Sequence, residues 1–395
     1  MRGQILVLTL GIAVTGSNSL VLSPILADVA QALGTTPVAV SRAIAAYGGA
    51  TALSAFLLAP RIDRVGPRRA LSAGMGAMAV AMLLSAGAGH WAVLALAQAL
   101  AGLGAGIVLP SIYALATSIA PKDAEAAVLG RVLTGWSLSL VVGVPAAALL
   151  TDLAGWRAPF LVLAALAVAS LAGTLRLPEA RPAQPEPATS PLAALGFPSV
   201  PPLLLVCLAF MAAFYGTYAF VGDAVRQATG ASAGMTGVIV LSYGIGFGLA
   251  NLADRRVDRL GAETVLPWAL TAVAGIYLAL ILATAALWSA AAATLAWGFG
   301  NHLCLNTLIV LLARANPERR GAVLGLNSAV TYLGALVGTG GAGLLLPQAG
   351  FAAICLAAAT LVAAAALVAR TQLPRSRGDV PGRRSDAPLL SQGCR

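Results

Sequence analysis

The sequence predicts an all-α integral membrane protein with twelve transmembrane helices in two pseudo-symmetric halves of six. Of its 395 residues, 59% are hydrophobic and only 10% are charged. Soluble domains carry about 45–50% apolar and about 25% charged residues, so this composition excludes an ordinary soluble domain. The other two observations are a series of apolar runs long enough to span a bilayer and a repeat that relates the two halves.

Apolar runs of roughly 20 residues, the length that crosses a bilayer, alternate with short polar segments. The first six spans are predicted at 5–26, 38–59, 70–89, 92–119, 128–150 and 158–177. The second six are predicted at 201–222, 235–253, 265–284, 287–313, 322–346 and 351–370. The predicted domains are an N-terminal six-helix bundle at 1–177, a proline-rich cytoplasmic linker at 178–200, a C-terminal six-helix bundle at 201–370 and a disordered basic tail at 371–395.

The basic residues predict the orientation of the chain. Of the 24 lysines and arginines, 21 lie on one side of the predicted spans, and the other side keeps Arg42, Arg157 and Arg226. Positively charged loops face the cytoplasm. We therefore expect a multi-pass protein of the inner cell membrane with both termini in the cytoplasm.

An internal repeat relates the two halves. Segment 61–66 reads RIDRVG after the second span, and segment 256–261 reads RVDRLG after the eighth, an offset of 195 residues. The same offset places AVLG at 127–130 onto AVLG at 322–325. Parallel repeats of this kind are typical of transporters whose halves are related by an axis along the membrane normal.

Over essentially its whole length the chain resembles a twelve-span transporter of the major facilitator superfamily. Residues 63–69, DRVGPRR, match that family's D-R-x-G-[RK]-[RK] loop with one inserted proline. Residues 98–106, QALAGLGAG, resemble its R-x-x-x-G-x-G stretch, with Gln98 at the position of the arginine. The replacement of that arginine puts the usual proton-coupling role of the position in doubt.

Two further segments resemble the drug and sugar efflux branch related to arabinose exporters. They are Gly143-Val144-Pro145 in the fifth span and the GWR sequence at 155–157. The resemblance implies proton-coupled efflux of small organic molecules. Small residues in apolar helices permit close helix packing, and the residues expected to pack or kink the spans are Gly102, Gly106, Gly143 and Pro145.

The resemblance also implies a cytoplasmic latch between the halves at the two repeated loops. Its expected members are Asp63, Arg64, Gly66, Arg68, Arg69, Asp258, Arg259 and Gly261. In the second copy Ala262 and Glu263 replace the arginine pair, so we expect the weaker latch there. The alternative is simple anchoring by positive charge, which needs the arginines but not Asp63 or Gly66.

Proton-driven carriers usually hold a titratable group in the membrane. All 14 acids are expected in loops, linker or tail, with Asp28, Asp152 and Asp223 at the outer ends of their spans. The proton-coupling candidate is therefore His302, near the middle of the span at 287–313. Asn306, one turn further on, shares its helix face and could hydrogen-bond the imidazole. The residues leave three roles open for His302: proton carrier, substrate contact or packing.

The resemblance implies that spans 1, 4, 7 and 10 face a central cavity. Polar residues on these and neighbouring spans are the expected substrate contacts: Asn18, Gln98, Tyr113, Trp136, Tyr215, Tyr218, Tyr243, Asn301, His302, Asn306 and Asn327. An inorganic anion would call for arginine in such a pocket. Amides, phenols and one imidazole without fixed charge favour a neutral or weakly polar organic substrate.

The expected function is secondary active export by alternating access, coupled to protons. An importer or uncoupled facilitator of a small neutral solute would have the same sequence features, and a non-transporting membrane sensor is a more remote alternative. A membrane-embedded enzyme is disfavoured because such enzymes need clustered acids. The expected partners are the substrate, membrane lipid and protons, with no nucleic acid, metal or cofactor, and we expect a monomer.

Overall fold

The structure is a computed structural model that describes residues 1–58, 62–121, 124–178, 191–316 and 320–372. Every regular element in this described part of the chain is helical. Most of the predicted linker and tail, residues 179–190 and 373–395, lies outside the described residues, so the expectation of a disordered tail is not tested. The side chain of Asp63 also lies outside them.

The first half contains the helices α1 to α9. Their bounds are α1 Arg2–Leu20, α2 Leu26–Ala32, α3 Pro37–Leu57, α4 Ile62–Val65, α5 Pro67–Ala86, α6 Trp91–Ile119, α7 Glu125–Leu138, the π-helical segment η2 Ser139–Gly143, α8 Val144–Ala154 and α9 Ala158–Leu175. The fifth predicted span is the continuous series α7, η2 and α8. Its π-helical segment ends at Gly143, two residues before Pro145, where the sequence predicts a kink.

The second half repeats this order. After the short 3-10 segment η3 Pro191–Gly196, its elements are α10 Val200–Thr229, α11 Ala233–Leu249, the 3-10 segment η4 Ala250–Ala253, α12 Asp254–Leu260, α13 Ala262–Ala283, α14 Leu287–Ala315 and α15 Arg320–Gln372. The last helix covers two predicted spans. Gly350, which has a φ of 72°, interrupts the helix and divides it into two segments.

The predicted number of twelve spans is confirmed. Ten helices of the described residues are long and apolar enough to cross a membrane, and the one at 321–372 divides into two at Gly350. The twelfth is α3, a 21-residue helix that is not among the ten. Its polar residues, among them Ser41, Arg42 and Thr51, reduce its hydropathy.

The repeat extends to the backbone. Gly66 and Gly261 start α5 and α13 with φ of 95° and 85°, and Gly155 and Gly350, also 195 residues apart, have φ of 82° and 72°. A side chain is disfavoured at such positive φ. Equivalent turns of the two halves therefore depend on glycine at equivalent positions.

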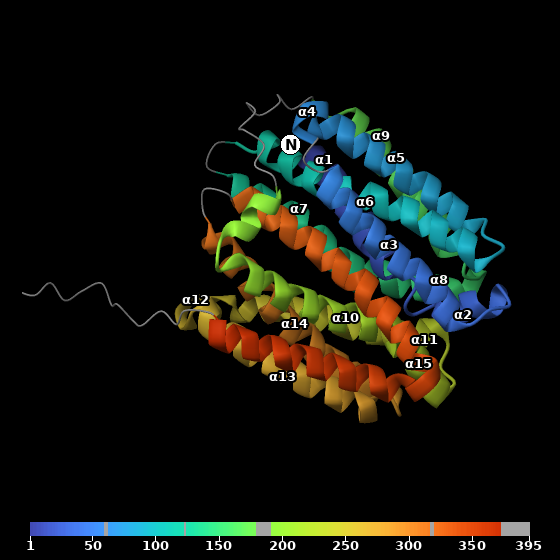
Figure 1. The fold of residues 1–395 in the computed structure, drawn as a ribbon. Coiled ribbons are helices and arrows are strands. Elements are labelled where there is room, and N and C mark those ends of the chain that lie inside the picture. The colour runs from blue at the N-terminus through green and yellow to red at the C-terminus, as the bar shows by residue number, and fades with distance from the viewer. Residues whose placement is uncertain (59–61, 122–123, 179–190, 317–319, 373–395) are drawn as a thin grey trace, which may run out of the picture.

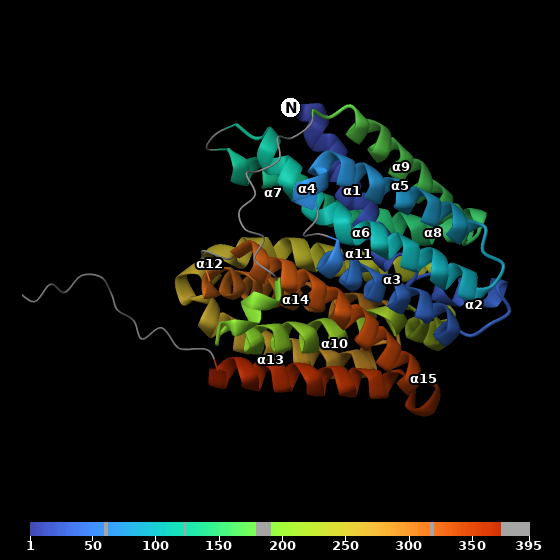
Figure 2. The same cartoon turned by 45° about the horizontal axis from the view of Figure 1, so that its top comes forward.

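The two halves lie side by side: most helices of the first half lie in the upper part of Figure 1, and α10, α13 and α14 of the second half lie in the lower part. The N-terminus, α4, α7 and α12 lie toward the left in Figure 1 and in the rotated view of Figure 2, and α2 lies at the right. We call the left side the basic end, because it holds the arginine-rich segments at 64–69 and 255–259, and the right side the opposite end.

The halves meet through α3 with α15 and through η2 and α8 with α11. At the opposite end, one hydrophobic cluster includes Leu26 and Ala148 of the first half together with Phe220 and Ala233 of the second. Another cluster, from Leu8 to Leu177, contains only residues of the first half. α7, the basic-end part of the fifth span, packs mainly on α1 and α6 of its own half. A third cluster also joins the halves, through Leu20, Leu140 and Val144 of the first half, and it contains no residue of α7.

Candidate transport site

A charged cluster connects the eighth and tenth spans of the second half. His302, near the middle of α14, has its Nε2 3.1 Å from Oδ1 of Asp254, the first residue of α12. Asn306 donates from Nδ2 to the same oxygen at 2.9 Å. The Asp254 side chain is 33% exposed and that of His302 is 10% exposed. We call these three residues the Asp254 cluster.

The Asp254 cluster changes two expectations from the sequence. His302 and Asn306 do lie on one helix face, but both contact Asp254 rather than each other. The sequence predicts a loop position for Asp254, as for the other acids, and indicates no role for it. The chain brings it to α14 because the eighth span continues through η4 into α12 without leaving the helix bundle. The His302 site therefore includes a carboxylate, contrary to the expectation of a region without fixed charge.

The helix of the seventh span extends beyond its predicted end at residue 222, and this places Asp223 inside a helix. Helix α10 continues to Thr229, so Asp223 lies within it and is only 4% exposed. Gln227, one turn later, donates a hydrogen bond of 2.8 Å to its Oδ2. The longer helix follows from residues 223–229, which contain no proline and no glycine before Gly230 ends the helix in the left-handed conformation.

Several predicted contacts form an aromatic group next to the Asp254 cluster. Phe214 lies 5.3 Å from Tyr218, 5.6 Å from Tyr243 and 4.9 Å from Tyr215 between ring centroids. Asn301 donates to the Tyr243 hydroxyl at 3.1 Å. The next turn of α11 carries Phe247, whose ring packs edge-on against His302 at 4.9 Å.

Two of the predicted contacts in this region have a polar atom that is buried without a hydrogen-bond partner among the described residues. The atoms are the Tyr218 hydroxyl and the Asn301 carbonyl oxygen. A buried polar group without a partner costs free energy. These atoms therefore offer hydrogen bonds that a bound molecule could complete.

The predicted residues of the first half form a separate, uncharged network. Asn18 donates to Oε1 of Gln98 at 3.1 Å, and Gln98 donates to Ser85 at 3.1 Å. Asn18 is 2% exposed and Gln98 is 1% exposed. The two amides are brought together, but they are buried against each other rather than exposed for contact with a solute.

Replacement of Gln98 by leucine is expected to destabilise the protein by about 1–3 kcal/mol, because Asn18 keeps a buried amide without its partner. The double replacement Asn18→Leu and Gln98→Leu should cost less than Gln98→Leu alone, since it removes both partners. Thermal unfolding of the purified variants in detergent measures both effects. A double variant less stable than Gln98→Leu alone would contradict this interpretation.

The remaining predicted contacts do not join either network. Tyr113 is 36% exposed, Trp136 is partly buried, and Asn327 is buried with its Oδ1 unpartnered among the described residues. In the predicted latch, Arg64 of α4 and Asp258 and Arg259 of α12 are exposed. Arg68 donates to the Leu177 carbonyl oxygen at 2.8 Å, a contact within the first half.

The predicted packing glycines lie at close helix contacts. A side-chain carbon at Gly102 would collide with the carbonyl oxygen of Tyr47, and one at Gly143 with the Ser17 hydroxyl. A carbon at Gly106 would come within 2.6 Å of Ser54. These positions bring α6 against α3, and η2 against α1, closer than any side chain would permit.

At the opposite end, polar contacts join the halves directly. Arg226 of α10 forms a two-pronged ion pair with Asp28 of α2, with Nη2 2.9 Å from Oδ1. Asp152 of α8 accepts hydrogen bonds from the Ser232 hydroxyl and the Gly234 N–H at the start of α11. We call Asp28, Asp152, Arg226 and Ser232 the opposite-end contacts. The sequence placed these three charges on one side of the membrane but gave no indication that they pair.

Comparison with known proteins agrees with this architecture. A family model described as Major Facilitator Superfamily matches residues 8–338 and, in a second match, 219–392. The uncharacterized MFS-type transporter YwfA of Bacillus subtilis is 29% identical over 90% of this chain and 88% of its own. The chloramphenicol resistance protein of Streptomyces lividans is 27% identical over 65% and 67%. The crystal structure of a D-xylose-proton symporter superimposes with a TM-score of 0.78 at 16% identity, covering 95% and 98%.

Proposed function

Because the chain belongs to the major facilitator superfamily, a family of transporters and not of enzymes, we propose that it is a proton-coupled exporter of small organic molecules. The observation that carries the proposal is the Asp254 cluster, a carboxylate and an imidazole in contact inside a membrane-spanning half. Ionisable groups at such positions are expensive and mark ion or substrate pathways.

The arrangement of the halves supports alternating access. The opposite-end contacts and a shared hydrophobic cluster join the halves there, whereas α7 packs within its own half. We assign the basic end to the cytoplasm, since 21 of the 24 basic residues belong to that side. The conformation is then one closed to the outside. Export requires the opposite-end contacts to break and the basic end to close, the step in which we propose that the latch residues meet.

The Asp254 cluster can hold a proton in a defined place. With His302 protonated, imidazolium and carboxylate form a charge-assisted hydrogen bond and the pair has no net charge. With His302 neutral, the pair has a charge of −1. Asn306 donates to Asp254 in both cases and holds the carboxylate in position. Since Asp254 begins α12, which also carries Asp258 and Arg259, the protonation state acts on the same segment as the proposed latch.

The surroundings of the Asp254 cluster and the similarity to known proteins favour a substrate class and a direction of transport. The aromatic group and the unpartnered atoms of Tyr218 and Asn301 suit a small, weakly polar organic molecule. Export is favoured by similarity to a protein named for chloramphenicol resistance and by the GVP and GWR segments of the efflux branch. An importer or facilitator of a neutral solute would use the same geometry, so only the measured direction of flux separates these functions.

The test is proton flux in liposomes that contain the purified protein and a preformed pH gradient. Phenicols, sugars and nucleosides are added one at a time, and a pH-sensitive dye reports collapse of the gradient. We expect one class to collapse it, and we expect His302→Ala to abolish that response while substrate binding stays measurable. The control is His90→Asn, at the exposed cap of α6, which should behave as the parent. Unchanged coupling in His302→Ala would overturn the proton assignment.

A further inference from the structure

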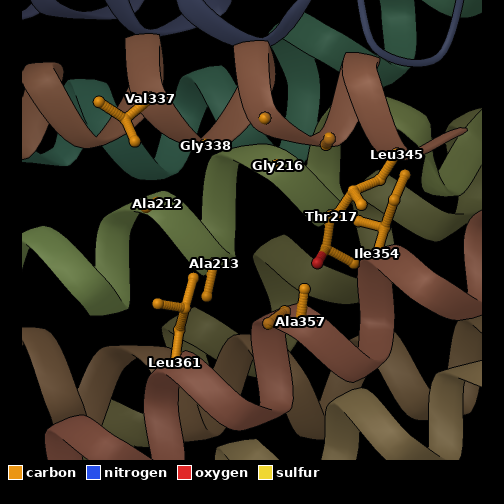
Figure 3. A pocket seen from close by; sticks show the side chains of 13 residues that line it. Ala212, Ala213, Gly216, Thr217, Val337, Gly338, Leu345, Ile354, Ala357 and Leu361 are labelled. Carbon is orange, nitrogen blue, oxygen red and sulfur yellow. The ribbon is translucent and has the colours of Figure 1, made fainter.

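A pocket of about 200 Å³ lies between α10 and the two segments of α15, apart from the Asp254 cluster. Its walls are alanine, glycine and branched aliphatic side chains, shown in Figure 3, including Ala213, Ala357 and Ile354. At its rim Val337 and Leu361 are 52% and 43% exposed, so the pocket opens to the outer surface of the bundle.

One polar side chain faces this carbon-lined space. Thr217 is fully buried, and its Oγ1 has no hydrogen-bond partner among the described residues. Figure 3 shows the oxygen directed into the space bordered by Ala213 and Ala357. Threonines on membrane helices usually donate to the carbonyl oxygen four residues earlier. Thr151 and Thr307 do so here, at 2.9 Å and 2.6 Å, and Thr217 does not.

The chemistry of the walls limits what can occupy the pocket. A buried water needs two to four polar partners, and an apolar cavity of roughly 150 Å³ stays dry and binds benzene. This pocket is somewhat larger and has one hydroxyl. A lipid acyl chain would fill the space but leave Thr217 without a hydrogen bond, which is costly away from water.

We propose that the pocket binds a small aromatic molecule carrying one hydroxyl group, a phenol, whose ring fills the space and whose hydroxyl pairs with Thr217. This site is separate from the proposed transport path and does not depend on the proposed function. It lies between α10, which carries Arg226 at its far end, and the segment of α15 that packs on α3 of the first half. An occupant would therefore fill a contact between α10 and α15 within the second half.

The test compares p-cresol with p-xylene, which has a methyl group in place of the hydroxyl. The full chain is held in phosphatidylcholine nanodiscs, so that acyl chains compete for the pocket. Binding is measured from the rise of the unfolding temperature with ligand concentration. We expect p-cresol to bind roughly three- to tenfold more tightly than p-xylene, the worth of one hydrogen bond, and Thr217→Val to remove this preference.

A filling variant and a neighbouring control separate this pocket from general partition into lipid. Gly341 lines the pocket, and a side-chain carbon there meets no atom within 4 Å, so Gly341→Leu should fill the space and abolish binding of both compounds. Gly340 also has open space but does not line the pocket, and Gly340→Leu should bind as the parent does. His302→Ala should likewise bind p-cresol normally. Equal binding of the two compounds by the parent, or unchanged binding in Gly341→Leu, would overturn the proposal.

Discussion

Replacing Arg226 with leucine is expected to abolish coupled transport and to open the opposite end of the bundle. The guanidinium group makes a two-pronged ion pair with Asp28 across the two halves, and both side chains are mostly buried. Removing it leaves Asp28 and the nearby buried Asp223 without compensation. Loss of one partner of such a pair costs about 2 kcal/mol or more, which shifts the balance toward the open arrangement by roughly thirtyfold.

Spin labels at the opposite end measure that shift. Gln31 of α2 and Thr229 of α10 are exposed on different halves, and cysteines at these positions report their separation. The native Cys207, Cys304 and Cys355 are buried, and Cys394 is replaced beforehand. We expect the Arg226→Leu distribution to move to longer distances.

Two further variants determine whether the ion pair of Asp28 and Arg226 keeps the opposite end closed. The exchange Asp28→Arg with Arg226→Asp should restore the shorter separation. Arg157→Leu, which removes an arginine that donates to the Ala88 carbonyl oxygen within the first half, should have no such effect. An Arg226→Leu protein with parental distances and parental transport would show that the ion pair does not hold the halves together.

Replacing Asp254 with asparagine is expected to reduce substrate-driven proton flux at least tenfold while downhill movement of substrate continues. Asparagine keeps the size of the side chain, but it cannot form an ion pair with imidazolium, so the cluster no longer stabilises a bound proton. Parallel measurement of substrate flux and dye response in the same liposomes separates coupling from transport.

Glu125→Gln is the matched control, because Glu125 is an exposed acid at the start of α7, at the same end of the bundle but outside the proposed latch. It should retain coupling. Asp254→Asn combined with His302→Gln should be no worse than either change alone, since both remove the same proton site. Additive losses from the two changes would mean that Asp254 and His302 act separately.

The sequence predicts the fold well because bilayer physics acts on composition and length. Apolar runs predict the twelve spans, within a few residues at most ends, and the repeated RIDRVG and RVDRLG segments predict two related halves. One clear difference is at α10, where Asp223 and Arg226 suggest an end but pairing keeps them in the helix. Hydropathy counts such residues as polar and contains no information about their partners.

The candidate site is less predictable than the fold, because the sequence does not show which polar side chains pair with each other. His302 and Asn306 are identifiable from depth and spacing on one helix, but Asp254 is 48 residues away and joins them only through packing of α12 beside α14. Asn18 and Gln98 are also correctly identified as polar residues in spans, yet their mutual hydrogen bond directs them away from a solute. A pattern of polar residues indicates which groups need partners; it does not indicate which partners they find.

The division of polar chemistry between the halves has an electrical consequence. The first half has an amide network and the second has the ionisable cluster, so the proposed mechanism moves charge only with the second half. A carrier loaded with neutral substrate and lacking the proton has a cluster charge of −1. A negative interior potential pushes that charge outward, by up to about 2.3 kcal/mol per 100 mV if it crosses the whole field. The membrane voltage therefore accelerates export of a neutral substrate. A substrate with one positive charge cancels the charge of the cluster, so the voltage does not accelerate its export. The current that accompanies transport would thus report the charge of the molecule carried.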